Sequence, residues 1–562
     1  MKIWVRGDLR LARDAVAARE LACNEYSRVA SRLESKCVSW FVSGDGGGGE
    51  RRQQKCIWTS RTTRPVVPVK MTRSYKKVVI ISTVGLVIMI LGIITGSLWT
   101  TTLYDLLFAN LFILTKTSLT YGLWVETPIP MYVKFYMFNW TNPREFYASS
   151  DVKPHFQELG PYVFREVDYK TNQVWNDNGT VTFQRRKVWH FEESLSNGSL
   201  TDEITNLNPI VATVASSMKH KPVLVRKLVD GVMVRLGEKL AITKTVNALI
   251  FEGFNDTLLD IARKMNMTTL PYSKFGWFYA RNNSDSYDGT FSMLTGATNI
   301  YDMGILKEWN FSNQTNNYKS SCGAIHGTLG DFWPPLSNNE TVSIFVPDIC
   351  TTLDFSYENT TKVEGLTGNK YIGRESMLDN GKSVPSRQCY CPDGGCGPSG
   401  TLNISTCKFG APAFVSMPHF YLADPNYRVN ISGMTPDRSK HELTLVLEPT
   451  TGIPLTVKAQ LQLNILLEPV SNMSMFENIK KTYIPILWFS QQANLTASYA
   501  SQVKLLLTLP SLGTVTFFGI AGIGILLFFI GVFVYVRKRW RGEESQVLIS
   551  KYDGDVRTRD EI

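Results

Sequence analysis

Two long stretches without a charged side chain dominate the hydrophobic pattern of this chain. The first runs from Val78 to Tyr104, and the second lies between Lys504 and Arg537. Each contains more than the ~20 apolar residues that an α-helix needs to cross the hydrocarbon core of a bilayer. The pattern therefore predicts transmembrane helices at 78–99 and 512–536, and it excludes an ordinary cytosolic enzyme.

The segment between the two spans shows the periodicity of both strands and helices. Alternating apolar residues on either side of a turn at 449–454 predict a β-hairpin over 442–467, and 341–346 is a further predicted strand. Steps of three and four predict a helix over 222–240, whose apolar face would consist of Val225, Leu228, Val229, Val232, Leu236 and Leu240. The charged residues between them are typical of a solvated helix face, and an exposed basic surface also suits the docking of anionic ligands.

Positive charge is concentrated at the start of the chain. The 562 residues carry a formal net charge of +10, and residues 1–70, with 14 Lys+Arg and 7 Asp+Glu, supply +7 of it. A nucleic-acid site would need basic residues interleaved with aromatics on a folded domain, so no nucleic-acid partner is expected. We interpret 1–70 as a disordered extension or the product of a mistaken upstream start, with Met71 as a natural initiator.

The charges that flank the spans predict the topology. Arg73, Lys76 and Lys77 precede the first span, and four basic residues at 537–541 follow the second. Positive charge marks the cytosolic ends of membrane helices. Both termini are therefore expected in the cytosol, with 100–511 lumenal or extracellular and 537–562 as a cytosolic tail. Gly92 and Gly96 in the first span have a spacing that permits close helix packing, which leaves homo-oligomerisation open.

Asparagine sequons support this topology. The predicted lumenal segment contains fourteen Asn-x-Ser/Thr motifs without a central proline. A single motif is usually accidental, but this density indicates a glycosylated domain. The predicted acceptors are Asn139, Asn178, Asn197, Asn255, Asn266, Asn282, Asn310, Asn313, Asn339, Asn359, Asn403, Asn430, Asn472 and Asn494.

Cysteine usage points to the same oxidising compartment. Three of the nine cysteines lie in residues 1–70, and the other six are Cys322, Cys350, Cys389, Cys391, Cys396 and Cys407. An even number in a lumenal segment favours disulfides, whereas a zinc site needs regular pairs supplying four ligands. Six cysteines allow fifteen pairings, and their spacing does not choose among them.

Catalytic motifs are not found. The six histidines are scattered, and the sequence has no HExxH, no G-x-S-x-G and no phosphate-binding GxxxxGK[ST] motif. Scattered carboxylates leave only a weak case for a lumenal glycosidase or lipase. The sequence predicts neither an enzyme nor a cofactor nor a metal site.

Several longer motifs are spread over the predicted lumenal segment. They are Trp124–Pro143, Glu158-Leu-Gly-Pro-Tyr-Val-Phe-Arg-Glu166, Phe275-Gly-Trp-Phe-Tyr, Asp288-Gly-Thr-Phe, Phe345-Val-Pro-Asp-Ile-Cys350, Gly410-Ala-Pro-Ala, Pro418-His-Phe-Tyr-Leu-Ala-Asp-Pro425 and Pro449-Thr-Thr-Gly-Ile-Pro454. With these motifs the chain resembles the class B scavenger receptor family, which includes a lysosomal integral membrane protein branch. The resemblance covers roughly 72–540 and does not include 1–70.

The resemblance implies an α+β fold, with two transmembrane helices flanking a large β-rich, disulfide-bonded ectodomain. An apical helical bundle and a hydrophobic tunnel are part of that fold. The implied disulfides are Cys322–Cys389, Cys350–Cys407 and Cys391–Cys396. The apical ligand-binding helices would correspond to 222–263, with Arg235 as a basic residue for anionic lipid ligands and Lys239 one helical turn further on.

Two features depart from the family pattern. Family members often carry palmitoylated cysteines beside the membrane, but the tails at 71–77 and 537–562 contain none. In the lysosomal branch a histidine takes part in binding an acid hydrolase. This chain has Val223 at that position, with His220 nearby, which speaks against hydrolase binding.

The tail contains an acidic dileucine pattern, Glu544-x-x-x-Leu548-Ile549. Such a pattern in a short cytosolic tail indicates binding to clathrin adaptors and delivery to endosomes and lysosomes. The leading hypothesis is a scavenger receptor-like glycoprotein that binds lipids, lipoproteins or anionic particles and moves lipid through a tunnel. The alternative is a lysosomal membrane protein that sorts a lumenal protein cargo or exports lipid. The expected location is the plasma membrane, the endosome-lysosome membrane or both.

Overall fold

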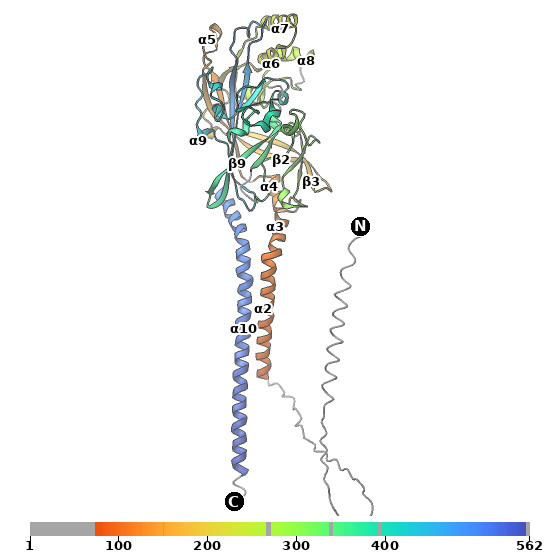
Figure 1. Cartoon of the computed structure of the whole chain (residues 1–562), viewed down its shortest axis with the longest axis vertical. Coiled ribbons are helices and arrows are strands. Elements are labelled where there is room, and N and C mark those ends of the chain that lie inside the picture. Colours follow the sequence, from red (N-terminus) through yellow and green to blue (C-terminus); the bar gives the residue numbers. More distant parts are fainter. Residues whose placement is uncertain are drawn as a thin grey trace, which may run out of the picture. The chain divides into compact units, whose positions relative to one another are not determined.

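The computed structural model describes residues 73–127, 129–149, 151–265, 271–336, 341–391 and 395–557. The predicted extension at 1–70 and the sequons at Asn266 and Asn339 lie outside these residues. Long helices at the beginning and end of the described chain flank a large β-rich ectodomain (Figure 1). This is the fold class that the sequence predicts.

Two helices are long and apolar enough to span a membrane, and both predicted spans fall within them. They cover Tyr75–Phe112, with 38 residues, and Ala497–Gly542, with 46 residues. The first consists of α2 (Arg73–Leu98), a π-turn (Trp99–Leu103) and α3 (Tyr104–Phe112), and the second is the greater part of α10 (Ala497–Arg557). Leu114 and Val503, just beyond and just inside them, are buried in ectodomain clusters, so both helices are anchored to the folded domain.

Small residues allow the two long helices to approach closely. A Cβ atom on Gly524 would lie 2.4 Å from the backbone nitrogen of Met89, and one on Gly92 would lie 2.6 Å from that of Ala521. Near the ectodomain, Trp99 donates its indole N–H to the carbonyl of Pro510 at 3.1 Å. Gly92, whose spacing left oligomerisation open, therefore packs against the second span of the same chain.

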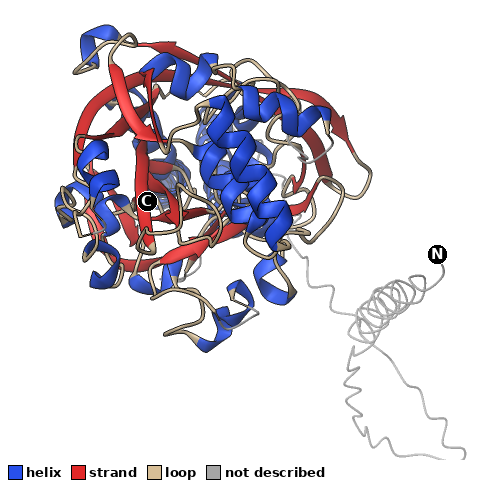
Figure 2. Ribbon diagram, turned by 90° about the horizontal axis from the view of Figure 1, so that it is seen from above, coloured by secondary structure: helices blue, strands red, loops and turns tan. Residues whose placement is uncertain are grey.

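The ectodomain is built on one curved antiparallel sheet of 13 strands, which Figure 2 shows from above. The hydrogen-bonded order is β7-β6-β3-β2-β1-β15-β14-β13-β10-β9-β8, and β11 and β12 join it through β14. The strands are β1 (Met131–Trp140), β2 (Phe156–Trp175), β3 (Thr180–Phe191), β6 (Thr290–Leu294), β7 (Leu306–Trp309), β8 (Val342–Val346), β9 (Thr351–Val363), β10 (Leu366–Ile372), β11 (Thr401–Asn403), β12 (Ala413–Ser416), β13 (Thr444–Leu447), β14 (Pro454–Leu467) and β15 (Thr482–Asn494).

Short helices lie around the sheet, and several of them are at the end farthest from the long helices (Figure 1). They are α4 (Leu119–Val125), α5 (Pro143–Ala148), α6 (Pro209–Met218), α7 (Val223–Leu236), α8 (Thr257–Lys264) and α9 (Arg438–His441). β4 (Glu203–Leu207) and β5 (Ala241–Thr245) pair as a separate two-stranded antiparallel sheet. In the chain, β4 precedes α6, and β5 lies between α7 and α8. A packed apical helical bundle stays a prediction.

The local patterns predict the strands better than the apical helix. The hairpin expected over 442–467 is the antiparallel pair β13–β14, and the strand expected at 341–346 is β8. The helix expected over 222–240 ends at Leu236, because Gly237 adopts a left-handed conformation with φ 70° and is the C-cap residue. Lys239 is therefore not one helical turn beyond Arg235 on the same helix.

The predicted apolar face of this helix is also wrong in part. Met233 is fully buried, and Val225 and Val229 pack against the core, so the buried stripe repeats every four residues. Leu228, assigned to the core face from its spacing, is 62% exposed. Because α7 lies at an edge of the domain, it buries a narrower stripe than its sequence offers.

Three disulfides staple the segment from 322 to 407. They join Cys322 to Cys389, Cys350 to Cys407 and Cys391 to Cys396. These are the pairings that the family resemblance implies. The first two close loops with sequence separations of 67 and 57 residues, which removes conformational freedom from the unfolded chain.

Candidate functional site

A cavity of about 430 Å³ lies between the apical helices and the sheet. Its volume falls in the range of pockets that bind small molecules. Its wall comes from α6, α8, the segment 272–279, η9 (Ser405–Lys408) with the residues after it, and strands β12, β14 and β15. The motifs at 275–279 and 410–413 contribute to this wall, but no sequence pattern predicts the whole set, because its members extend from Pro209 to Phe489.

Apolar side chains make up most of the cavity wall. Ile210, Val214 and Met218 face it from α6, and Leu259 and Ala262 face it from α8. The sheet and the intervening segments add Phe275, Trp277, Phe278, Ile349, Ile404, Val415, Leu461, Leu463, Leu487 and Phe489. Such a wall excludes water from a hydrocarbon chain and gives few hydrogen bonds to a polar molecule.

A small number of polar groups interrupt this wall. They are Thr213, Ser217, Tyr272, Lys274, Tyr279, Tyr287, Asp348, Lys408 and Gln462. Burial raises the pKa of Tyr272 and Tyr287, so these phenols stay protonated and can donate hydrogen bonds. A mostly apolar cavity with a few polar groups has the chemistry needed to hold an amphiphile.

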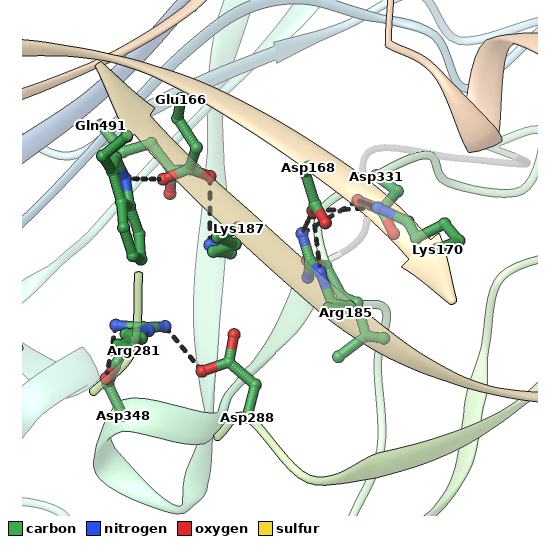
Figure 3. Close-up of polar contacts among 12 residues, drawn as sticks. Glu166, Asp168, Lys170, Arg185, Lys187, Arg281, Asp288, Asp331, Asp348 and Gln491 are labelled. Carbon is green, nitrogen blue, oxygen red and sulfur yellow. Dashed lines mark hydrogen bonds and ion pairs between the residues drawn. The ribbon is translucent and has the colours of Figure 1, made fainter. Parts of the chain in front are cut away.

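A cluster of charged side chains lies at the cavity, where Asp348 and Lys408 line the wall and Arg281 and Asp288 do not (Figure 3 shows Arg281, Asp288 and Asp348). Arg281 Nη1 lies 3.0 Å from Asp348 Oδ1, and Arg281 Nη2 lies 2.9 Å from Asp288 Oδ1. Lys408 Nζ lies 3.9 Å from the same oxygen of Asp348. Burial alone would raise the pKa of Asp348, but Arg281, together with Lys408 and Lys187, outweighs burial and lowers that pKa. The carboxylate therefore stays ionised beside the cavity.

The disulfide Cys350–Cys407 holds this charged part of the wall together. Asp348 lies two residues before Cys350, and Lys408 directly follows Cys407. The covalent link therefore fixes the two segments that carry the carboxylate and the amine. The sequence analysis did not select Lys408 as a site residue. The feature of the sequence that could have indicated it is its position next to the disulfide cysteine Cys407.

A second buried charge network joins β2 and β3 to Asp331, which lies outside the strands (Figure 3). Lys170 Nζ lies 2.9 Å from Asp168 Oδ2 and 3.2 Å from Asp331 Oδ1, and Arg185 contacts both carboxylates. Burial alone would raise the pKa of Asp168, but Arg185 and Lys170 keep it well below the ordinary value. Two anions and two cations balance one another and do not line the cavity, so we assign this network to the stability of the fold.

Two stacked histidines form a third buried polar cluster. The rings of His419 and His441 are nearly parallel, with centroids 4.5 Å apart, and both residues are at most 4% exposed. The Nδ1 atom of His419 accepts the backbone N–H of Thr435 at 3.0 Å, and that of His441 accepts the N–H of Asp437 at 2.9 Å. Since its Nδ1 is an acceptor, His441 is neutral and carries its proton on Nε2. The Nε2 atom of His419 lies 2.6 Å from Glu158 Oε2, which ties this ring to a carboxylate.

The residues predicted to bind ligands lie elsewhere. Arg235, in the last turn of α7, and Lys239, after the helix, are both exposed and do not line the cavity. Glu544 is exposed on α10, whereas the side chains of Leu548 and Ile549 lie outside the described residues. The structure thus separates an exposed basic apex from an internal apolar cavity.

Comparisons with known proteins agree with the fold. A model of the CD36 family matches residues 83–535. Protein peste of Drosophila melanogaster is 35% identical over 413 residues, which cover 72% of this chain and 73% of that protein. Scavenger receptor class B member 1 of Mus musculus is 31% identical over 439 residues, covering 76% and 85%. Lysosome membrane protein 2 of Rattus norvegicus is 31% identical over 428 residues, covering 75% and 87%.

Proposed function

The chain belongs to the CD36 family and is a scavenger receptor-like membrane protein, and from this premise we propose that it binds lipids, lipoproteins or other anionic particles and passes lipid through its ectodomain. The observation that carries the proposal is the apolar cavity of about 430 Å³ behind the apical helices. Keeping a lipid chain in such a cavity avoids a hydration cost of ~0.8 kcal/mol for each CH₂ group.

The apex has the surface that a lipid particle would meet. Leu224 and Leu228 on α7 are 70% and 62% exposed, and Arg235 is exposed on the same helix. Exposed apolar side chains and a cation on one helix suit a particle whose surface combines anionic head groups with hydrocarbon. With both termini in the cytosol, this apex would face the lumen or the outside of the cell, where the predicted glycans would also lie.

The proposal is tested by filling the cavity. Replacing Ala262, which lines the cavity on α8, with tryptophan should lower the yield of cavity adducts from a diazirine-bearing fatty acid at least tenfold, because the indole occupies the space of the lipid chain. The full chain in lipid nanodiscs is irradiated, and the adducts are located by mass spectrometry. Lys264→Trp, on the same helix but exposed and not part of the wall, should leave the yield unchanged.

Two outcomes of this experiment contradict lipid binding in the cavity. In the first, the unmodified chain is labelled on its surface and on α2 and α10, but not in α6 or the segment 272–279. In the second, Ala262→Trp folds normally and retains full labelling of the cavity wall.

The tail motif favours a second candidate, a lysosomal membrane protein that sorts a lumenal cargo or exports lipid. Glu544, Leu548 and Ile549 fit an acidic dileucine signal, and some relatives are named lysosome membrane protein 2. Started at Met71, the protein should accumulate in lysosomes, and Leu548→Ala/Ile549→Ala should move it to the cell surface. Fluorescence microscopy against a lysosomal marker measures this shift. A plasma-membrane location for both proteins would favour uptake at the cell surface instead.

A further inference from the structure

Lys408 places a primary amine on the wall of an apolar cavity. A third of its side chain, 33%, is accessible, and Ile349, Ile404 and Phe409 line the cavity beside it. Its ion-pair partner among the described residues is Asp348 at 3.9 Å, beyond the usual length of a hydrogen bond. Asp348 is already paired with Arg281 at 3.0 Å. The ammonium form of Lys408 is therefore weakly compensated.

These surroundings shift Lys408 toward the neutral amine. Removal from water disfavours the charged form of a lysine and lowers its pKa, and Arg281 adds to this effect, although Asp348 and Asp288 oppose it. A lysine desolvated in an apolar pocket is a nucleophile, because the unprotonated amine has a free electron pair. The disulfide Cys350–Cys407 fixes the backbone beside it, so the amine has a defined position at the wall.

We propose that Lys408 captures long-chain aldehydes that enter the cavity by forming an imine with them. The amine nitrogen attacks the aldehyde carbon, a C–N bond forms, and the carbonyl oxygen leaves as water after taking up the two amine hydrogens. One aldehyde and one amine give one imine and one water, and no oxidant or reductant is needed. Hydrolysis reverses the reaction and releases the aldehyde unchanged.

The surroundings of Lys408 suit both parts of such a ligand. The apolar wall holds the hydrocarbon chain, and it keeps water, the product that reverses the reaction, at low local concentration. If the imine takes up a proton, the ionised Asp348, whose Oδ1 lies 3.9 Å from Lys408 Nζ, provides a counter-charge. The inference rests on the proposed function, because the cavity must first admit a single-chain lipid.

The test uses the full chain in lipid nanodiscs with hexadecanal and cyanoborohydride, which converts an imine into a stable secondary amine. Mass spectrometry should find the hexadecyl group on Lys408 at least tenfold more often than on Lys274, the other lysine of the cavity wall. Lys408→Arg should remove this adduct, and Lys274→Arg should leave it unchanged. An excess of hexadecanol, which cannot form an imine, should suppress it at least fivefold by competing for the cavity.

The outcomes distinguish a failure of the imine proposal from a failure of lipid binding in the cavity. If the diazirine fatty acid labels the cavity but hexadecanal modifies Lys408 no more than exposed lysines, the imine proposal is wrong and lipid binding stands. If neither probe reaches the cavity, both proposals fail. If Lys408→Arg does not fold, the unmodified chain still decides the matter through the ratio of Lys408 to Lys274 adducts and through hexadecanol competition.

Discussion

Replacing Asp168 with alanine is expected to destabilise the ectodomain by about 3–5 kcal/mol, because removing one partner leaves a buried charge uncompensated. Asp168 accepts contacts from Lys170 and Arg185, whose side chains are 0% and 9% exposed. After the change, Asp331 alone faces both cations. Chemical denaturation of the full chain in nanodiscs, followed by tryptophan fluorescence, measures the loss.

Two variants place this result in context. Asp151→Ala removes an exposed carboxylate that lies 2.9 Å from Lys480, and it should cause no measurable loss because water solvates both charges. Asp168→Leu/Arg185→Met removes one charge of each sign and leaves Lys170 paired with Asp331, so it should cost less than Asp168→Ala. If Asp168→Ala proves as stable as Asp151→Ala, the buried charge network does not stabilise the fold.

Lowering the pH from about 6.5 to about 4 is expected to reduce stability through His441, by at most about 3 kcal/mol at 1.36 kcal/mol for each pKa unit. Burial, together with the neighbouring His419, lowers the pKa of His441 from 6.5 to about 4, although Glu158 and Asp437 oppose this. The unfolded chain therefore binds the proton first as the pH falls. The contribution of His441 to stability is fully present above about pH 6.5 and declines toward pH 4. Below about pH 4 this group causes no further loss.

The hydrogen bonds explain the direction of this shift. A second proton on His441 must go to Nδ1, where it abolishes the bond from the Asp437 N–H. His441→Asn retains an acceptor near the Nδ1 position but cannot titrate, so its melting temperature should vary less between pH 6.5 and 4. His190→Asn, at an exposed position, should retain the decline of the unmodified protein. An unchanged pH profile in His441→Asn would rule out this histidine as the cause.

Local patterns in the sequence predict the elements whose surroundings are simple. The spans need only length and apolarity, and the β13–β14 hairpin needs only alternation around a turn. The apical helix was harder, because at the edge of a domain the neighbouring elements decide which apolar residues are covered. Leu228 and Met233 have similar hydrophobicity and sit in the same helix, yet one is 62% exposed and the other is fully buried.

The candidate site depends on contacts that no local pattern contains. Along β14 the polar residues Gln460, Gln462 and Asn464 alternate with apolar ones, which usually indicates a solvated face, but all three are at most 1% exposed. They are buried because other parts of the chain supply partners, such as Ser416 for Asn464. The cavity and Lys408 arise in the same way, from segments that are distant in sequence.

The pairing of the first strand with the last has a consequence for the time course of biosynthesis. β1 ends at Trp140, whereas its partner β15 begins at Thr482. At ~5–20 residues per second, the ribosome needs roughly 17–70 s to pass from one to the other. During that interval one edge of β1 has no neighbouring strand, and Gly92 of α2 has no second helix to pack against. A nascent chain that ends before Asn494 cannot complete the sheet, so the emerging protein needs protection against aggregation until its last strand leaves the ribosome.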